Sequence, residues 1–353
     1  MSDATPRSAD GSGKDPDPDA KTAVTVLVAL AANLVIAVAK AVGGVFAGSP
    51  ALLSEAAHSV ADSLNEVFLL ASLKRSKKAP DDQHPFGYGK ERYFWSLLAA
   101  VGIFVMGGCF SVFQGFEALH TGSSEDHSGY LVGLAVLGVA LLAEGSSLVR
   151  ALVQVRGHAR EAGHGTLAEL RRGDDPTLRT VLAEDSTACL GVLFAIAGMW
   201  LHMVTGNAAY EAAASFLIGA LLGYVAYRLA MESRGRLIGE AIDPVQRHEL
   251  RVFLDEQPEI DTVTSLLTMR LGNDSTLVAA RIDLVPGLDS EEVERVLVRV
   301  KAAMARAWPY ADQIFLDVTD ASAGDRARAH RDRKALEEVV AARSEDAEGD
   351  RDG

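Results

Sequence analysis

Six apolar stretches, each long enough to cross a lipid bilayer, fill most of the chain between Ala23 and Met231. A spanning helix needs about 20 mostly apolar residues. The stretches are Ala23–Phe46, Pro50–Leu73, Phe94–Leu119, Tyr130–Val149, Leu178–Met203 and Ala208–Met231. The sequence therefore predicts an α-helical membrane protein with six transmembrane helices.

Composition averaged over all 353 residues hides this division between an apolar middle and charged ends. The mean hydropathy of +0.12 is that of an ordinary globular protein. A formal net charge of −14 and a pI near 5.1 argue against nucleic acid as the main partner. Cys109 and Cys189 both lie in apolar stretches, which excludes a disulfide framework and a cysteine-rich zinc module.

Lys and Arg occupy every second connection between the stretches. The connections Ala47–Ser49, His120–Gly129 and Val204–Asn207 contain neither residue, whereas the intervening ones are basic. The positive-inside rule then predicts that both termini are cytoplasmic. A polar tail precedes the first stretch, so we do not expect a cleaved signal peptide there. The absence of a transit peptide and the Ala-, Arg- and Asp-rich usage favour a bacterial inner membrane.

Four segments follow from this pattern: a disordered tail (1–21), a six-helix membrane domain (22–240), a cytoplasmic domain (241–320) and a charged, disordered tail or frayed helix (321–353). The cytoplasmic domain has the order helix, strand, strand, helix, strand, which indicates a small α+β fold with a helix-backed open sheet. Its elements are expected at Val245–Glu256, Ile260–Arg270, Thr276–Leu284, Ser290–Trp308 and Ile314–Val318, with Asp289 as a helix cap.

Ionisable residues inside the second and fifth stretches are the candidates for function, because such groups are costly in a membrane. His58, Asp62 and Asn65 share one helix face, and Glu184 and Asp185 lie about two turns into the fifth stretch. One imidazole with two or three carboxylates suits Zn²⁺, and Mn²⁺, Fe²⁺ or Co²⁺ also fit. A hydrogen-bonded pair such as His58–Asp185, or a proton relay, remains an alternative.

Three motifs carry a family resemblance: GSPALLSEAAHSVADSLNEVFLL, DDQHPFGYGKERYFW and DDPTLRTVLAEDSTACLGVLFAIAG. They resemble the cation diffusion facilitator family of zinc and related divalent-metal transporters, from about Lys21 to Asp320. The resemblance implies a homodimer with a ferredoxin-like cytoplasmic domain. It also implies a metal site at His58, Asp62 and Asp185. Val181 stands where the family usually has His, so Glu184 is the expected fourth ligand of a Glu-Asp variant.

A second family site would map to Asp81, His84 and Tyr88; the alternative is a structural turn that holds phospholipid or the C-terminal domain. Dimerisation is the expected role of the C-terminal domain, because His248 is its only histidine before residue 321. The remaining candidates are weaker. Glu117, Glu144 and Glu211 are expected to pair with neighbouring helices or line a water path, and His120, Asp126, His127, His158 and His164 to lie in solvated loops.

These observations predict a secondary transporter that exports Zn²⁺ from the cytoplasm by proton antiport, because no nucleotide-binding G-x-x-x-x-G-K-[ST] run is present. An Mn²⁺ or Fe²⁺ exporter of the same family is one alternative. A membrane-embedded metal-dependent hydrolase is another, although neither H-E-x-x-H nor G-x-S-x-G occurs. A structural or sensory membrane protein is the third. We expect no enzymatic activity and no prosthetic group.

Overall fold

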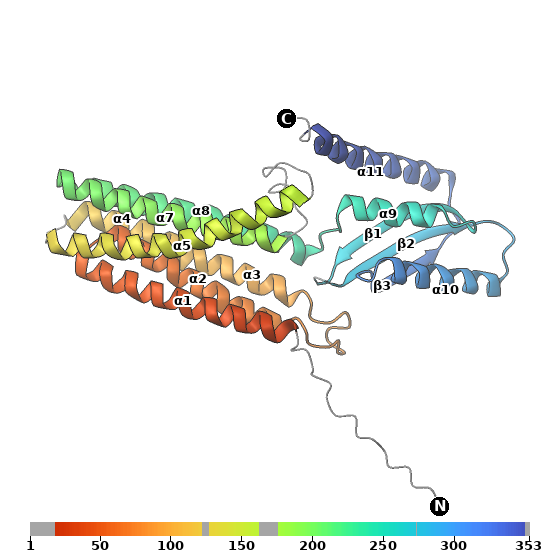
Figure 1. Ribbon diagram of the computed structural model, residues 1–353. Coiled ribbons are helices and arrows are strands. Elements are labelled where there is room, and N and C mark those ends of the chain that lie inside the picture. Colours follow the sequence, from red (N-terminus) through yellow and green to blue (C-terminus); the bar gives the residue numbers. More distant parts are fainter. Residues whose placement is uncertain (1–17, 122–126, 162–175, 273, 350–353) are drawn as a thin grey trace, which may run out of the picture.

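The computed structural model describes residues 18–121, 127–161, 176–272 and 274–349. Within these ranges, long helices lie side by side in a bundle, and a small α/β unit follows at one end of it (Figure 1). The bundle elements are α1 (Pro18–Ala47), α2 (Pro50–Arg75), α3 (Glu91–Gly102), η1 (Ile103–Cys109), α4 (Phe110–Thr121), α5 (His127–Glu161), α7 (Pro176–Thr205) and α8 (Ala209–Ile238). The predicted fold class is confirmed.

Among the described residues, five helical rods are long and apolar enough to cross a membrane. They are α1, the continuous rod α3–η1–α4, α5, α7 and α8. α2, a helix of 26 residues in the same bundle, is not among these five because it carries Glu55, Asp62 and Glu66. α2 packs against α1, α3, α4, α7 and α8, so its polar side chains face other helices rather than lipid.

The junction between α1 and α2 is a tight turn that the local sequence explains. Gly48 has a φ of +60°, a conformation that glycine adopts without steric cost. Ser49 caps α2, since its hydroxyl oxygen accepts a hydrogen bond from the Leu52 backbone N–H at 3.3 Å, and Pro50 occupies the first helical position. The two helices therefore form an antiparallel hairpin, which aligns α1 with the polar face of α2.

The third rod contains a π-helical segment, η1, where it crosses α8. A Cβ atom added to Gly107 would lie 2.7 Å from Leu222 Cδ1 of α8, and one added to Gly219 would lie 3.1 Å from the Gly108 carbonyl oxygen. Small residues let membrane helices approach closely, and the glycines at this crossing leave little room for a larger side chain. The irregular turn thus accompanies the tightest packing of the two rods.

The α/β unit comprises α9 (Pro244–Asp255), β1 (Ile260–Arg270), β2 (Thr276–Leu284), α10 (Ser290–Ala307) and β3 (Gln313–Val318). This order agrees with the predicted one. β2 is the central strand, antiparallel to β1 and parallel to β3. Asp289 caps α10 as predicted, in a reciprocal capping box with Glu292. Leu250, Val263, Ile282 and Val300 are among the buried residues of its core.

For the segment after β3 the sequence left a disordered tail or a frayed helix open, and the structure has a helix, α11 (Ala323–Gly349). Ala329 and Leu336, two turns apart, are buried on the face that packs against α9 and β1. Arg326 pairs with Asp261 and Asp283 of the sheet, and Arg343 Nη1 lies 2.6 Å from Asp243 Oδ2. Tertiary ion pairs and a narrow apolar stripe therefore hold α11 against the sheet and α9.

Candidate metal centre

His58 and Asp62 of α2 form the centre of the candidate site. They lie one helical turn apart, and His58 Nε2 is 3.2 Å from Asp62 Oδ2. The His58 side chain is 5% exposed, whereas the Asp62 side chain is 40% exposed. A buried imidazole therefore meets an accessible carboxylate, which leaves one side of the pair open to an incoming ion.

Glu184 of α7 is turned toward the same face of α2. Asn65 Nδ2 donates a hydrogen bond to Glu184 Oε1 at 3.4 Å. Asp62 exerts the largest electrostatic effect of any charged group on Glu184. Both observations place the Glu184 carboxylate on the side of α7 that faces the His58–Asp62 pair.

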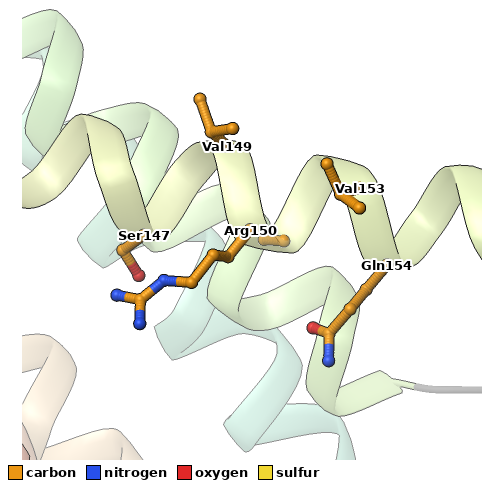
Figure 2. A pocket seen from close by; sticks show the side chains of 6 residues that line it. Ser147, Val149, Arg150, Val153 and Gln154 are labelled. Carbon is orange, nitrogen blue, oxygen red and sulfur yellow. The ribbon is translucent and has the colours of Figure 1, made fainter.

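Asp185, the next residue of α7, faces α5 instead, because adjacent helical residues point about 100° apart. It lies beside Ser147 and Arg150 of α5, with Asp62 a weaker electrostatic neighbour. Figure 2 shows Ser147 and Arg150 in a surface pocket of α5 that Val149, Val153 and Gln154 also line. The buried Oδ2 atom of Asp185 has no hydrogen-bond partner among the described residues. That oxygen is free to bind a cation.

Glu66 extends the acidic face of α2, and the sequence interpretation assigned it no role. It lies one turn after Asp62 and accepts a hydrogen bond from Asn33 Nδ2 of α1 at 2.9 Å. Glu66 also contributes to the electrostatic environment of Glu184. The sequence did contain a signal for Glu66, since the i, i+4, i+8 spacing of His58, Asp62 and Glu66 aligns all three on one helix face.

These side chains are not gathered into a closed set of ligands. Within the described ranges, no three His, Cys, Asp or Glu side chains lie close enough together to hold a metal ion. The structure brings His58 and Asp62 together and turns Glu184 toward them, and it leaves Asp185 against α5. Four ligands converge on one ion only if α7 and α2 move relative to each other or the side chains rotate.

The loop between α2 and α3 has the geometry of a structural turn. Lys78 Nζ and Tyr88 Oη both donate to Asp81 Oδ2 at 2.7 Å, and the His84 backbone N–H donates to Asp81 Oδ1 at 2.9 Å. The hydrogen bonds from Lys78 and Tyr88 hold the pKa of Asp81 well below its usual range. The carboxylate is thus already occupied by donors, which favours the structural reading of Asp81, His84 and Tyr88 over a second metal site.

The same loop and the first turn of α3 contact the α/β unit, at the end of the bundle where that unit lies (Figure 1). Tyr93 Oη donates to the Gly272 carbonyl oxygen at 3.0 Å. Gly89 packs against the backbone of Leu271 and Gly272 so closely that a Cβ would not fit. Holding the C-terminal domain was one of the two structural roles that the sequence suggested for this loop.

Glu144 and Glu211, two of the other acidic candidates, occupy buried pairs, whereas Glu117 is exposed. Glu144 lies 2.9 Å from Lys40 Nζ, and Glu211 accepts hydrogen bonds from Ser49 and Tyr130 and contacts His202. In the C-terminal domain Arg281 and Asp317 form an ion pair at 2.9 Å. Asp126 and His164, and the side chains of His127, His158 and Val181, lie outside the described residues.

Comparison with known proteins supplies the family. A family model described as the cation efflux transmembrane domain matches residues 26–238. Metal tolerance protein C4 of Arabidopsis thaliana is 35% identical over 235 residues, which are 67% of this chain and 51% of that protein. The mitochondrial proton-coupled zinc antiporter SLC30A9 of Homo sapiens is 32% identical over 259 residues, 73% of this chain and 45% of that protein.

A bacterial relative aligns over more of its own length. The manganese efflux system protein MneP of Bacillus subtilis is 23% identical over 304 residues, 81% of this chain and 96% of that protein. By contrast, the chain spans about half the length of the Arabidopsis and human relatives. The residues that the family model matches include the helical bundle that holds His58, Asp62 and Glu184.

Proposed function

Because the chain belongs to the cation efflux family of divalent-metal transporters, we propose that it exports Zn²⁺ from the cytoplasm in exchange for protons. Membership of this family makes the protein a transporter and not an enzyme, which sets the hydrolase alternative aside. The observation that carries the proposal is the buried His58 paired with the accessible Asp62, with Glu184 turned toward them.

We assign Zn²⁺ four ligands: His58 and Asp62 of α2, and Glu184 and Asp185 of α7. A tetrahedral site of one imidazole nitrogen and carboxylate oxygens suits Zn²⁺. The orphan Oδ2 of Asp185 and the accessible Asp62 support this assignment. Movement of α2 and α7 closes the set around the ion on one side of the membrane and opens it on the other.

Protons supply the drive in this proposal. Metal ligands must be deprotonated to bind, so protons and Zn²⁺ compete for His58 and the carboxylates. Inward movement of a proton across the membrane releases about 2.3 kcal/mol per charge for each 100 mV of potential. The human relative carries the name proton-coupled zinc antiporter, which supports the same coupling here.

We further propose that the protein is a homodimer in a bacterial inner membrane, with both termini in the cytoplasm. The basic loop between α2 and α3 and the α/β unit lie at the same end of the bundle, which supports this orientation. Light scattering of the protein in detergent measures the dimer. Protease accessibility of α11 in intact cells tests the orientation.

The test of the proposed site is Zn²⁺ flux into proteoliposomes that contain the Asp62→Ala variant. We expect flux to fall to the level of protein-free vesicles while the folded protein is retained. A carboxylate in the middle of a membrane helix is energetically costly unless it binds an ion, so Asp62 is expected to serve ion binding. Asp82→Asn, an exposed carboxylate of the loop, serves as the control and should transport like the wild type. Wild-type flux by Asp62→Ala would rule out the site.

Manganese export is the second candidate function. Glu66 adds a further carboxylate beside Asp62 and Glu184, and oxygen-rich sites favour Mn²⁺ over Zn²⁺. The Bacillus relative is named as a manganese efflux protein. Parallel flux measurements with each ion, at equal free concentration, distinguish the two functions.

A further inference from the structure

A buried cluster of three charged side chains lies next to His58, on the side away from Asp62. Lys40 Nζ of α1 is 3.0 Å from Glu55 Oε2 of α2 and 2.9 Å from Glu144 Oε1 of α5. The side chains of Lys40 and Glu55 are 1% and 0% exposed. Ions buried this deeply are costly unless paired, and here one ammonium serves two carboxylates. The three groups hold α1, α2 and α5 together next to the proposed metal site.

Beside these charged groups, one buried atom of Glu55 and one of His58 face each other without a hydrogen bond. Glu55 Oε1 and His58 Nδ1 are 3.9 Å apart, which is beyond hydrogen-bond reach. Neither atom has a hydrogen-bond partner elsewhere in the described part of the chain. An acceptor and a ring nitrogen are therefore left facing each other in a buried environment, where native structures ordinarily pair such groups.

α7 leaves room for these two side chains at Gly191. A Cβ atom added there would collide with Glu55 Oε1 and would lie 3.5 Å from His58 Nδ1. Not every glycine of the bundle is so constrained, since a Cβ on Gly138 of α5 meets nothing within 4 Å. The space beside Gly191 allows the imidazole to shift toward Glu55.

We propose that Glu55 is a positioning residue for His58, held in place by Lys40: when Zn²⁺ binds His58 Nε2, the Nδ1–H group donates to Glu55 Oε1. This inference rests on the proposed metal site. Coordination occupies the Nε2 lone pair and displaces the contact with Asp62, so the N–H of the neutral ring is then on Nδ1. A carboxylate that accepts this N–H orients the ring and raises the basicity of the ligand nitrogen.

The ion pair with Lys40 holds Glu55 in position to accept a hydrogen bond from His58. The ammonium binds Oε2 only, so Oε1 remains available to the imidazole. Because Lys40 also pairs with Glu144, the cluster retains a net negative charge, which favours an N–H donor at His58 Nδ1. Loss of Glu55 removes the acceptor that faces His58, whereas loss of Glu144 removes only a partner of Lys40.

The test uses the full chain purified in detergent, with Zn²⁺ titration and the visible absorption spectrum of bound Co²⁺ as readouts. Glu55→Gln should weaken Zn²⁺ binding by about tenfold or more, the size typical of a lost partner of a metal-bound histidine, and should change the Co²⁺ spectrum. Glu144→Gln is the matched control, because it removes the same charge from Lys40. It should weaken binding by less than about threefold and leave the spectrum unchanged.

A second pair of variants keeps every charge in place. Gly191→Ala pushes a methyl group into the space of Glu55 Oε1 and should reproduce the effects of Glu55→Gln, while Gly138→Ala should bind like the wild type. This pair remains informative if Glu55→Gln fails to fold.

Three results separate the inference from the proposed function. Equal losses in Glu55→Gln and Glu144→Gln would overturn the inference, because Glu55 would then act only as a counter-ion of Lys40. Wild-type binding and spectrum in Glu55→Gln and Gly191→Ala, with binding lost in Asp62→Ala, would overturn it and leave the metal site standing. Wild-type binding by Asp62→Ala would instead refute the metal site.

Discussion

Glu184 and Asp185 are adjacent carboxylates that face different helices, and this difference governs what each contributes. Glu184 lies toward Asn65 and Asp62 of α2, and Asp185 lies toward Ser147 and Arg150 of α5. We expect Glu184→Gln to weaken Zn²⁺ binding by about tenfold, since it loses a charged oxygen ligand. Val181→Ala should change little beyond packing. Calorimetric Zn²⁺ titration of both variants measures the ranking, and the opposite order would show that Glu184 does not face the site.

His58 supplies the only nitrogen of the proposed site, and it therefore controls the choice of metal. Nitrogen ligands suit Zn²⁺, whereas oxygen ligands suit harder ions such as Mn²⁺. Replacing His58 with Asp should raise the affinity for Mn²⁺ relative to Zn²⁺ by about tenfold. Competition between the two ions for the purified protein measures this ratio, with Asp82→Asn as the unchanged reference. A ratio equal to that of the wild type would remove His58 from the ligand set.

At the scale of elements, a buried hydrogen-bonded cluster joins four helix ends opposite the α/β unit. Tyr130 Oη donates to Glu211 Oε1 at 2.8 Å and contacts His202 Nδ1 at 2.8 Å, and Ser49 Oγ donates to Glu211 Oε2 at 2.5 Å. These side chains come from the start of α5, the end of α7, the start of α8 and the cap of α2. The cluster therefore closes that end of the bundle.

Tyr130→Phe removes the hydroxyl from this cluster with little change in shape. The buried Glu211 carboxylate then loses one of its hydrogen-bond partners, and the loss should cost about 1–3 kcal/mol of stability. Thermal unfolding in detergent measures the change. Tyr224→Phe is the matched control, because Tyr224 is 59% exposed. The stability of this variant should lie within about 0.5 kcal/mol of that of the wild type. Equal melting temperatures of the two variants would contradict a stabilising role for the cluster.

For the whole molecule, proton coupling requires that the rate of Zn²⁺ export respond in opposite ways to pH on the two sides of the membrane. His58 and the carboxylates can bind either protons or Zn²⁺, so acid and metal compete for the empty site. Acid on the outer side should speed export, since protons there help displace Zn²⁺ from its ligands. Acid on the cytoplasmic side should slow export, since protons there compete with loading.

Inside-out vesicles with the pH of each face set independently measure both effects. The reference is the same vesicle preparation with equal pH on both sides, and an ionophore that collapses the pH difference should abolish the asymmetry. Zn²⁺ movement that ignored both pH values would indicate a uniport or channel path instead of antiport.

The sequence by itself determined the features that depend on neighbouring residues. The apolar runs predict each spanning helix, and the order of elements from α9 to β3 follows from local periodicity. The His58–Asp62 pair is also local, because one helical turn separates the two residues and brings their side chains together. Asp289 predicts the start of α10 for the same reason, since a cap and its helix are adjacent in the chain.

Only the tertiary structure decided which distant groups meet. Lys40 lies 104 residues from Glu144, and the rotation of α1 and α5 about their axes determines that they pair. The same rotations turn Glu184 toward α2 and Asp185 toward α5, which residue spacing within α7 cannot specify. α11 is helical because Arg326 and Arg343 reach partners on the sheet and at the start of α9. Such contacts depend on how whole elements pack, and no single segment of sequence encodes that packing.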